Sequence, residues 1–393
     1  MTGNHALVFG ASGVNGWAIT NALLSGYPSD TAFSKVTALT NRPMTREAAL
    51  WPQNDKLQIV SGIDLLNGDG VESLKAEMKE MIEDIHTVSH VYFFAYIFNE
   101  DPNKEIAVNV KLIEQAITSV DQLSSNLKFV VLPTGTKAYG VHLIDKFPFP
   151  NQLPLDEELP RIPEPYASDM FYYNQIDMLT SLSQGKSWTW CEVRPDIVVG
   201  FVPNNNVYCM AQWLALYLSL YAAVEGHGAE VPFPGTPISW VNLCNDSSQD
   251  IVAKFSIYAS LHPESSSGQA FNVADNATAS SWSVKWPIIC SYFGLKGTAP
   301  PADGPGPKPY DYLVEHQDQW VELEKKHGLQ TGRVGNDRSL GGYPHFIMSQ
   351  FDFDRHMDLT KSHRVWGDNA VQTDAKGSWF TAFDRFRQAK IIP

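Results

Sequence analysis

A run of glycines near the start of the chain has the spacing that binding a nucleotide requires. Gly10, Gly13 and Gly16 form G-x-x-G-x-x-G directly after a short apolar run. Such glycines make a tight turn that lets a pyrophosphate approach the backbone, and the helix that follows offers free N–H groups and a positive dipole end. A bare turn is the alternative; a serine hydrolase elbow needs G-x-S-x-G, which is not present. We predict a dinucleotide cradle made of Gly10, Ser12, Gly13, Val14, Asn15 and Gly16.

The end of the second predicted strand indicates which dinucleotide is bound. Enzymes that use NAD place an acidic residue there for the ribose 2′-hydroxyl, whereas NADP requires a cation for the 2′-phosphate. The strand ends in Leu-Thr-Asn-Arg-Pro, and the first acid is Glu47. Arg42 offers two donors to a phosphate, with further hydrogen bonds from Thr40 and Asn41. We therefore predict NADPH/NADP, with a solvated surface arginine as the alternative. Asp64, after the third predicted strand, either caps the adenine amino group or serves a turn.

The tyrosine and lysine expected of a carbonyl-reducing enzyme do not occur in their usual spacing. In Tyr-x-x-x-Lys the lysine lowers the pKa of the tyrosine, so that the phenol gives its proton to a carbonyl. Here Tyr172 is followed four places later by Ile176, and Tyr173 by Asp177. From the residues alone, the favoured interpretation of both tyrosines is that of packing aromatics at the start of a helix, and Lys137 is then a surface charge.

The elements that would position these residues alternate between strand and helix patterns. Short apolar runs predict strands at 5–9, 36–39, 57–60, 90–94, 128–132 and 188–193, with helices at 17–25, 71–85 and 107–120. This alternation is typical of an α/β fold with a doubly wound parallel (Rossmann) sheet. Residues 1–200 are mainly an NADP-binding domain. Residues 201–393, richer in proline, glycine and aromatics, are mainly a smaller substrate-binding or lid region, with some segments returning to the Rossmann core.

Composition excludes several classes of partner. The 393 residues carry a formal charge of −14, which argues against nucleic acid and against an anionic membrane surface. The apolar run 207–224 contains polar residues and predicts a buried or lid helix rather than a membrane span. Four widely spaced cysteines show no metal-binding pattern, so we expect no metal and a reduced compartment. With no signal-peptide pattern, we expect a soluble cytoplasmic protein, and a homodimer is left open.

Most of the chain resembles a known family, the progesterone 5β-reductase/iridoid synthase-like (PRISE) reductases, a divergent branch of the extended short-chain dehydrogenases. The resemblance rests on several motifs together. They are Gly-Ala-Ser-Gly-Val-Asn-Gly at 10–16, Leu-Pro-Thr-Gly-Thr-Lys-Ala-Tyr at 132–139, Phe-Tyr-Tyr-Asn-Gln-Ile-Asp at 171–177, Val-Arg-Pro-Asp-Ile-Val-Val-Gly-Phe at 193–201, Ala-Phe-Asn-Val at 270–273 and Ala-Lys-Ile-Ile-Pro at 389–393.

The resemblance implies a catalytic pair, Tyr172 and Lys137, and NADPH-dependent reduction of the C=C bond of an enone or enal. Hydride at the β-carbon creates an enolate, whose oxygen the phenol and the ammonium stabilise. The ammonium is also expected to make Tyr172 more acidic. Two departures leave the substrate open: Ile176 replaces the first acid of the family's Glu-Asp pair, and the segment between Tyr139 and Tyr172 differs from the plant members.

Further site residues complete the prediction. We assign Ala95 and Thr134 to the cofactor site, and the resemblance implies backbone contacts from Ile197 and Val198 to the nicotinamide carboxamide. Aromatic residues of a mostly apolar substrate pocket are predicted to be Tyr96, Tyr139, Trp213 and Tyr217.

Three alternative functions stay open. A carbonyl reductase would use Tyr172 as its proton donor, and a redox-neutral cyclase would keep NADP as a scaffold. A dinucleotide-sensing regulator, the non-enzyme alternative, would be expected to have lost Lys137 and Tyr172 as a pair.

Overall fold

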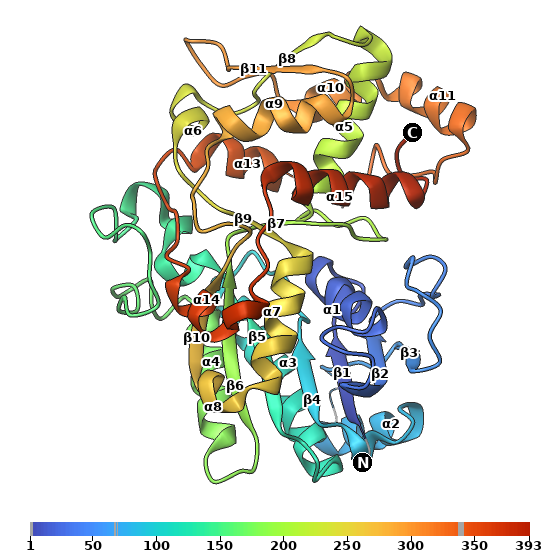
Figure 1. Ribbon diagram of the computed structural model, residues 1–393, viewed down its shortest axis with the longest axis vertical. Helices are drawn as coiled ribbons and strands as arrows, with labels where there is room; N and C mark the ends of the chain where they lie inside the picture. Colours follow the sequence, from blue (N-terminus) through green and yellow to red (C-terminus); the bar gives the residue numbers. More distant parts are fainter. Residues whose placement is uncertain (1–2, 67, 69, 337–341) are drawn as a thin grey trace.

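A computed structural model describes residues 3–66, 68, 70–336 and 342–393. Its centre is a seven-stranded parallel sheet in the order β10-β6-β5-β4-β1-β2-β3 (Figure 1). The order reverses between β1 and β4, and such a switch point is where open α/β sheets bind ligands. The predicted doubly wound Rossmann sheet is confirmed. Its strands are β1 (Asn4–Phe9), β2 (Phe33–Thr40), β3 (Leu57–Ser61), β4 (His90–Phe93), β5 (Phe129–Pro133), β6 (Thr189–Pro195) and β10 (Gln269–Val273).

The strands read as continuous apolar runs because both faces of the sheet are buried. In β1, Ala6 and Val8 belong to one hydrophobic cluster, and the alternating Leu7 and Phe9 belong to the other. Helices α1 (Val14–Leu24) and α7 (Gln249–Leu261) contribute to the first cluster. The second is closed by α2 (Val71–Met81), α3 (Pro102–Leu123) and α4 (Phe171–Ser183).

Most helices of the second half gather beyond the carboxyl ends of the strands, at the top of Figure 1. They include α5 (Met210–Glu225), α6 (Pro237–Val241), α9 (Trp282–Tyr292), α10 (Pro309–Glu315), α11 (Gln317–His327), α13 (Tyr343–Gln350) and α15 (Ala375–Gln388). The apolar run 207–224 forms α5, in which residues 210–220 are all buried, as predicted. Among the described residues, no helix has the length and apolar character needed to cross a membrane.

Several segments of the second half return to the sheet. Strand β10 pairs with β6 and forms one edge of the sheet, and α14 (Thr360–Trp366) packs against β10 and α7. Two small parallel pairs lie outside the central sheet. They are β8 (Glu230–Pro232) with β11 (Lys296–Thr298), and β7 (Ile197–Val199) with β9 (Asp246–Ser248). The short helices are α8 (Pro263–Ser266), η1 (Ile85–Thr87), η2 (Thr136–Tyr139), η3 (Val141–Lys146) and η4 (Gly367–Asn369).

Helix boundaries differ from the predicted ones where local capping decides them. Helix α1 begins at Val14, not at residue 17, because Gly13 is already its N-cap. Helix α3 begins at Pro102, since the Asp101 carboxylate accepts hydrogen bonds from the N–H groups of Asn103 and Lys104. Both helices therefore start closer to the carboxyl ends of the strands than the apolar periodicity alone indicates.

Candidate active site

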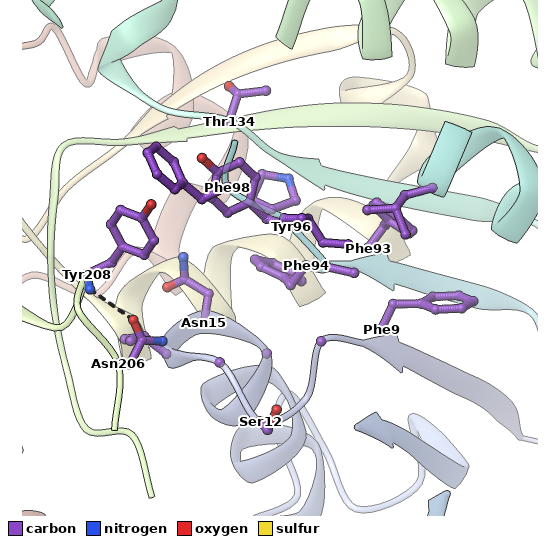
Figure 2. A pocket seen from close by; sticks show the side chains of 18 of the residues that line it. Phe9, Ser12, Asn15, Phe93, Phe94, Tyr96, Phe98, Thr134, Asn206 and Tyr208 are labelled. Atoms are coloured by element: carbon purple, nitrogen blue, oxygen red, sulfur yellow. Dashed lines mark hydrogen bonds between the residues drawn. The ribbon is translucent and has the colours of Figure 1, made fainter. Parts of the chain in front are cut away.

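A cavity of about 680 Å³ lies at the carboxyl ends of the strands, at the switch point between β1 and β4. Its wall is formed by the ends of β1, β2, β4, β5 and β6, the loop after β3, the start of α4, the loop before α5 and the start of α13. Figure 2 shows part of this wall, with Phe9, Asn15 and Tyr208 among the labelled residues. Most of the predicted site residues line this one cavity. They are Gly10, Ser12, Gly13, Val14, Asn15, Gly16, Thr40, Asn41, Asp64, Ala95, Tyr96, Thr134, Lys137, Tyr172 and Val198.

The three glycines of the cradle serve different purposes. Gly10 has a φ of +73°, and a Cβ there would lie 2.5 Å from the carbonyl oxygen of Phe94. A Cβ on Gly16 would collide with the carbonyl oxygen of Gly10. Gly13 has an ordinary φ of −84°, and its Cβ would meet only the oxygen of Gly10, at 3.3 Å. Gly10 and Gly16 are thus required by the fold, whereas Gly13 keeps the cavity side of the turn free.

The N-terminus of α1 suits an anionic group. The first N–H groups of a helix have no partner within it, and Gly13 offers no side-chain cap. Free N–H groups, a positive dipole end and no acidic residue in the first turn fit a pyrophosphate.

The end of β2 is built around Thr40, whose side chain holds the turn. Its hydroxyl donates to the Arg42 carbonyl oxygen at 2.8 Å and lies 2.7 Å from Ser61 Oγ. Thr40 and Asn41 line the cavity; Arg42 is exposed and lies outside the lining. Asp64 also lines the cavity. Its Oδ1 accepts a hydrogen bond from the backbone N–H of Leu66 at 2.9 Å, so Asp64 stabilises a turn, which is one of its two predicted roles.

The predicted catalytic pair faces the same cavity. Lys137 lies on η2, after β5, and Tyr172 lies in the first turn of α4. The ammonium of Lys137 is accessible through the cavity, yet the protein around it limits its hydration and lowers its pKa, an effect that Glu105 opposes. Burial raises the pKa of the Tyr172 phenol, and nearby acidic groups add to the rise. The expectation that Lys137 makes Tyr172 more acidic is therefore corrected, because desolvation of the phenolate dominates.

A buried carboxylate supports the segment that carries Lys137. Asp196, whose side chain is 2 % exposed, accepts from Thr136 Oγ1 at 3.2 Å and from the N–H of Asn245 at 3.3 Å. Arg355 Nε lies 3.6 Å from Asp196 Oδ1, and the arginine is itself buried. Burial raises the pKa of Asp196, and Arg355 opposes that rise. Asp196 also lines the cavity, which connects the cofactor side of the site to the C-terminal region.

Tyr139 belongs to a polar network behind the cavity and not to the pocket wall. Its hydroxyl donates to Asn272 Oδ1 at 2.7 Å and accepts from Arg194 at 3.1 Å. Arg194 in turn makes two hydrogen bonds of 2.8 Å to Glu192, which accepts from the cavity-lining Thr134. The prediction of Tyr139 as a pocket residue is corrected: its phenol is 1 % exposed and all its polar partners lie in the interior.

Three other predicted residues also lie away from the cavity. Trp213 and Tyr217 are each 1 % exposed on α5, where Tyr217 packs against Tyr221 and Tyr312. Both belong to the core of the C-terminal region, because α5 is covered on all sides over this stretch. Val198 lines the cavity, whereas Ile197 is not among the lining residues and its side chain is buried. The predicted contact from the Ile197 backbone stays a prediction.

Sequence reasoning missed the aromatic residues that do form the wall near Tyr172. They are Phe98, Phe171, Tyr208 and Tyr343. Phe171 could have been identified as the first residue of the Phe-Tyr-Tyr motif, and Phe98 lies two residues after the predicted Tyr96, in the loop after β4. Tyr208 and Tyr343 carry no local signal, since only the tertiary fold brings them to the carboxyl ends of the strands.

The switch-point cavity, its glycine cradle and the tyrosine and lysine beside it define a Rossmann-fold oxidoreductase of the short-chain dehydrogenase kind. Residues 6–393 match the model of the PRISE-like Rossmann-fold domain, so the chain belongs to this family and the resemblance is confirmed. The chain is 36 % identical to the short chain dehydrogenase ausT of Aspergillus calidoustus, over 99 % of this chain and 94 % of that protein.

More distant similarities follow the same pattern. The (S)-8-oxocitronellyl enol synthase ISY1 of Nepeta racemosa is 26 % identical, over 99 % of this chain and 93 % of that protein. Among solved structures, the Bordetella bronchiseptica enzyme WbmH in complex with NAD⁺ aligns with a TM-score of 0.58 at 13 % identity, covering 98 % of this chain and 99 % of that one. At that identity the likeness shows the fold.

Proposed function

We propose that the protein is an NADPH-dependent reductase of the C=C bond of an α,β-unsaturated carbonyl compound. The observation that carries the proposal is that Tyr172 and Lys137 line the same cavity as the glycine cradle. Among the described residues, neither the Tyr172 phenol nor the Lys137 ammonium makes a side-chain hydrogen bond or an ion pair. Both are therefore available as donors to an oxygen that becomes negatively charged during the reaction.

The bound nicotinamide would supply hydride to the β-carbon of the enone. Tyr172 and Lys137 would then hold the carbonyl oxygen as it gains enolate charge, and donors fixed in advance stabilise such charge strongly. Because burial raises the pKa of Tyr172, the side chain stays a neutral phenol and keeps its proton to donate. The α-carbon takes its proton from solvent, which reaches the cavity through its open mouth.

The choice of NADPH rests on the end of β2. Thr40 and Asn41 line the cavity there, Arg42 is the next residue, and no acid stands where a ribose 2′-hydroxyl would need one. The bound NAD⁺ of WbmH supports a nicotinamide dinucleotide in this fold. The name of the Nepeta enzyme, an enol synthase, agrees with chemistry that places charge on a carbonyl oxygen.

NADPH deuterated at the transferred position tests the proposal against its alternatives. The protein is mixed with a panel of enones and enals, and the products are identified by mass spectrometry and NMR. Deuterium at the β-carbon is the expected result. Deuterium on the carbinol carbon would instead identify a carbonyl reductase, and product without deuterium a redox-neutral cyclase. Binding of NADPH without any turnover over a broad panel would favour the dinucleotide sensor.

A further inference from the structure

A row of aromatic rings leads from the mouth of the cavity to the catalytic tyrosine. Tyr96 stacks on Phe171, with ring centroids 5.5 Å apart and an interplanar angle of 19°. Phe171 contacts Tyr172 edge to face at 4.5 Å. The loop after β4 is thereby joined to the start of α4, and the row ends at the phenol that would hold the enolate oxygen.

A second set of rings faces this row across the mouth. Tyr208, from the loop before α5, lies edge-on to Tyr96 at 6.0 Å and to Phe98 at 6.4 Å (Figure 2). Its backbone N–H donates to Asn206 Oδ1 at 3.0 Å, which holds this loop in place. Tyr343 of α13 packs edge to face against Tyr208, with ring centroids 5.2 Å apart. The rings come from separate segments of the chain and surround one opening.

Three of these rings are left uncovered. Tyr96 is 39 % exposed, Phe98 58 % and Tyr208 37 %. Large apolar side chains that gather uncovered around a cavity mark a binding surface. The exposed area of these rings is large enough to contact a further flat ring, which aromatic side chains attract in an offset or T-shaped geometry.

The charges of the cavity limit what else the substrate carries. Lys137 is the one lysine or arginine among the described lining residues, and it belongs to the proposed catalytic pair. Asp64 and Asp196 are the acidic residues of that lining. A phosphate or carboxylate on the substrate would have no cation of its own, so the chemistry favours a neutral molecule.

We propose that the substrate is a neutral enone bearing a flat aromatic ring. The ring lies against Tyr96, Phe98 and Tyr208 at the mouth, and the carbonyl reaches Tyr172 and Lys137. This inference rests on the proposed function for the enone, whereas the ring's place rests on the aromatic wall alone. The two are therefore testable separately.

Binding of saturated ketones tests the aromatic ring without any turnover. The probes are benzylacetone and its cyclohexyl analogue, which differ in the flatness and π-system of the ring and have the same carbon number. Each is titrated by calorimetry into the full-length protein saturated with NADP⁺. We expect Phe98→Leu and Tyr208→Leu each to weaken benzylacetone binding about five- to tenfold, since an aromatic pair contributes binding free energy beyond that of its buried area. Binding of the cyclohexyl ketone should weaken less than about threefold in the same variants.

The matched control is Tyr310→Leu, at an exposed tyrosine on α10 outside the cavity lining. It should leave both affinities unchanged, and thermal melting verifies that all three variants fold. Equal losses for the two ketones, or no loss for either, would overturn the aromatic-ring inference.

A parallel turnover assay separates the inference from the proposed function. Benzylideneacetone and its cyclohexyl analogue are the substrates, with NADPH as reductant. If neither is reduced but benzylacetone binds with the selectivity described, the ring assignment stands and the C=C reductase assignment fails. If both enones are reduced and the variants lower kcat/KM equally for the two, the reductase stands and the ring assignment fails.

Discussion

Thr136 donates a hydrogen bond of 3.2 Å to Asp196, and this contact fixes the residue directly before Lys137. Asp196 is in turn held by the N–H of Asn245 and faces the buried Arg355. The position of the ammonium in the cavity thus depends on segments more than a hundred residues away in the chain. Stability and activity are therefore coupled at this carboxylate.

Replacing Asp196 with Asn should destabilise the fold strongly. The buried Arg355 guanidinium would lose its nearest counter-charge and keep only the influence of Asp246, which already pairs with Lys285. Breaking a buried ion pair costs about 3 to 5 kcal/mol. The control is Asp177→Asn, which removes an ion pair with Arg161 whose side chains are 62 % and 49 % exposed. That pair should contribute about 1 kcal/mol or less. Urea unfolding measures both, and similar losses in the two variants would contradict the role given to Asp196.

The glycines of the cradle should separate into binding and folding positions. Gly13→Val places a branched side chain beside the cavity at an ordinary φ, so the protein should fold and lose NADPH binding more than about a hundredfold. Gly16→Ala should instead destabilise the fold by about 1 to 3 kcal/mol, because its Cβ collides with the Gly10 carbonyl. Calorimetric titration and thermal melting distinguish the two effects. A folded Gly13→Val protein with normal NADPH affinity would show that this glycine only turns the chain.

Arg42→Glu should weaken NADPH binding by about 2 kcal/mol and change NADH binding little. The substitution removes a charge-assisted contact to the 2′-phosphate and adds repulsion. Arg364→Glu is a suitable control, since this exposed arginine lies on α14, against β10 at the opposite edge of the sheet. Calorimetry with both cofactors gives the comparison. Tighter NADH than NADPH binding in the unmodified protein would reject the cofactor assignment.

Tyr172→Phe should lower turnover about a hundredfold, the usual effect of removing one donor to a developing oxyanion. Lys137 acts as an ammonium, and its pKa is lowered because the surrounding protein limits its hydration. Activity should therefore fall as the pH rises through that lowered pKa, and Lys137→Arg should shift this loss to higher pH. The profile of kcat/KM against pH measures the effect. Undiminished turnover in folded Tyr172→Phe would remove the tyrosine from the mechanism.

Buried histidines should make the fold sensitive to acid. Burial lowers the pKa of His90 to about 3 and that of His5 to about 4. Each neutral histidine contributes its full stabilisation above the pKa of the unfolded state, near 6.5. This stabilisation is lost as the pH falls from there toward the lowered pKa of the folded state. At pH 5 the loss is about 2 kcal/mol per histidine. His90→Gln should reduce the loss of unfolding free energy between about pH 8 and pH 5. His327→Gln, at an exposed histidine, should leave this loss unchanged, and urea unfolding at each pH measures both variants.

Local sequence patterns determined the sheet and the cradle. Residues 5–9 lie in a strand that is buried on both faces. Such a strand is a continuous apolar run in the sequence, and the spaced glycines after it indicate the turn that follows. The helix ends were less well predicted, because Gly13 and Asp101 act as caps beyond the apolar periodicity. The pair Lys137 and Tyr172 was predicted only from the family resemblance. Tyr172 has no lysine four places later, so no local motif in the sequence marks either residue as catalytic.

Only the tertiary structure decided which aromatic side chains face the cavity. Tyr139, Trp213 and Tyr217 have the composition of a pocket wall, yet they are buried in the interior. Tyr208 and Tyr343 are separated by more than a hundred residues and meet at the mouth. The physical reason is that turn and strand preferences act over a few neighbouring residues, whereas the face that a ring presents depends on how distant segments pack around it. The sequence by itself therefore determined the glycine cradle at the carboxyl end of β1, and the packing of the second half over the sheet determined which side chains form the rest of the cavity wall.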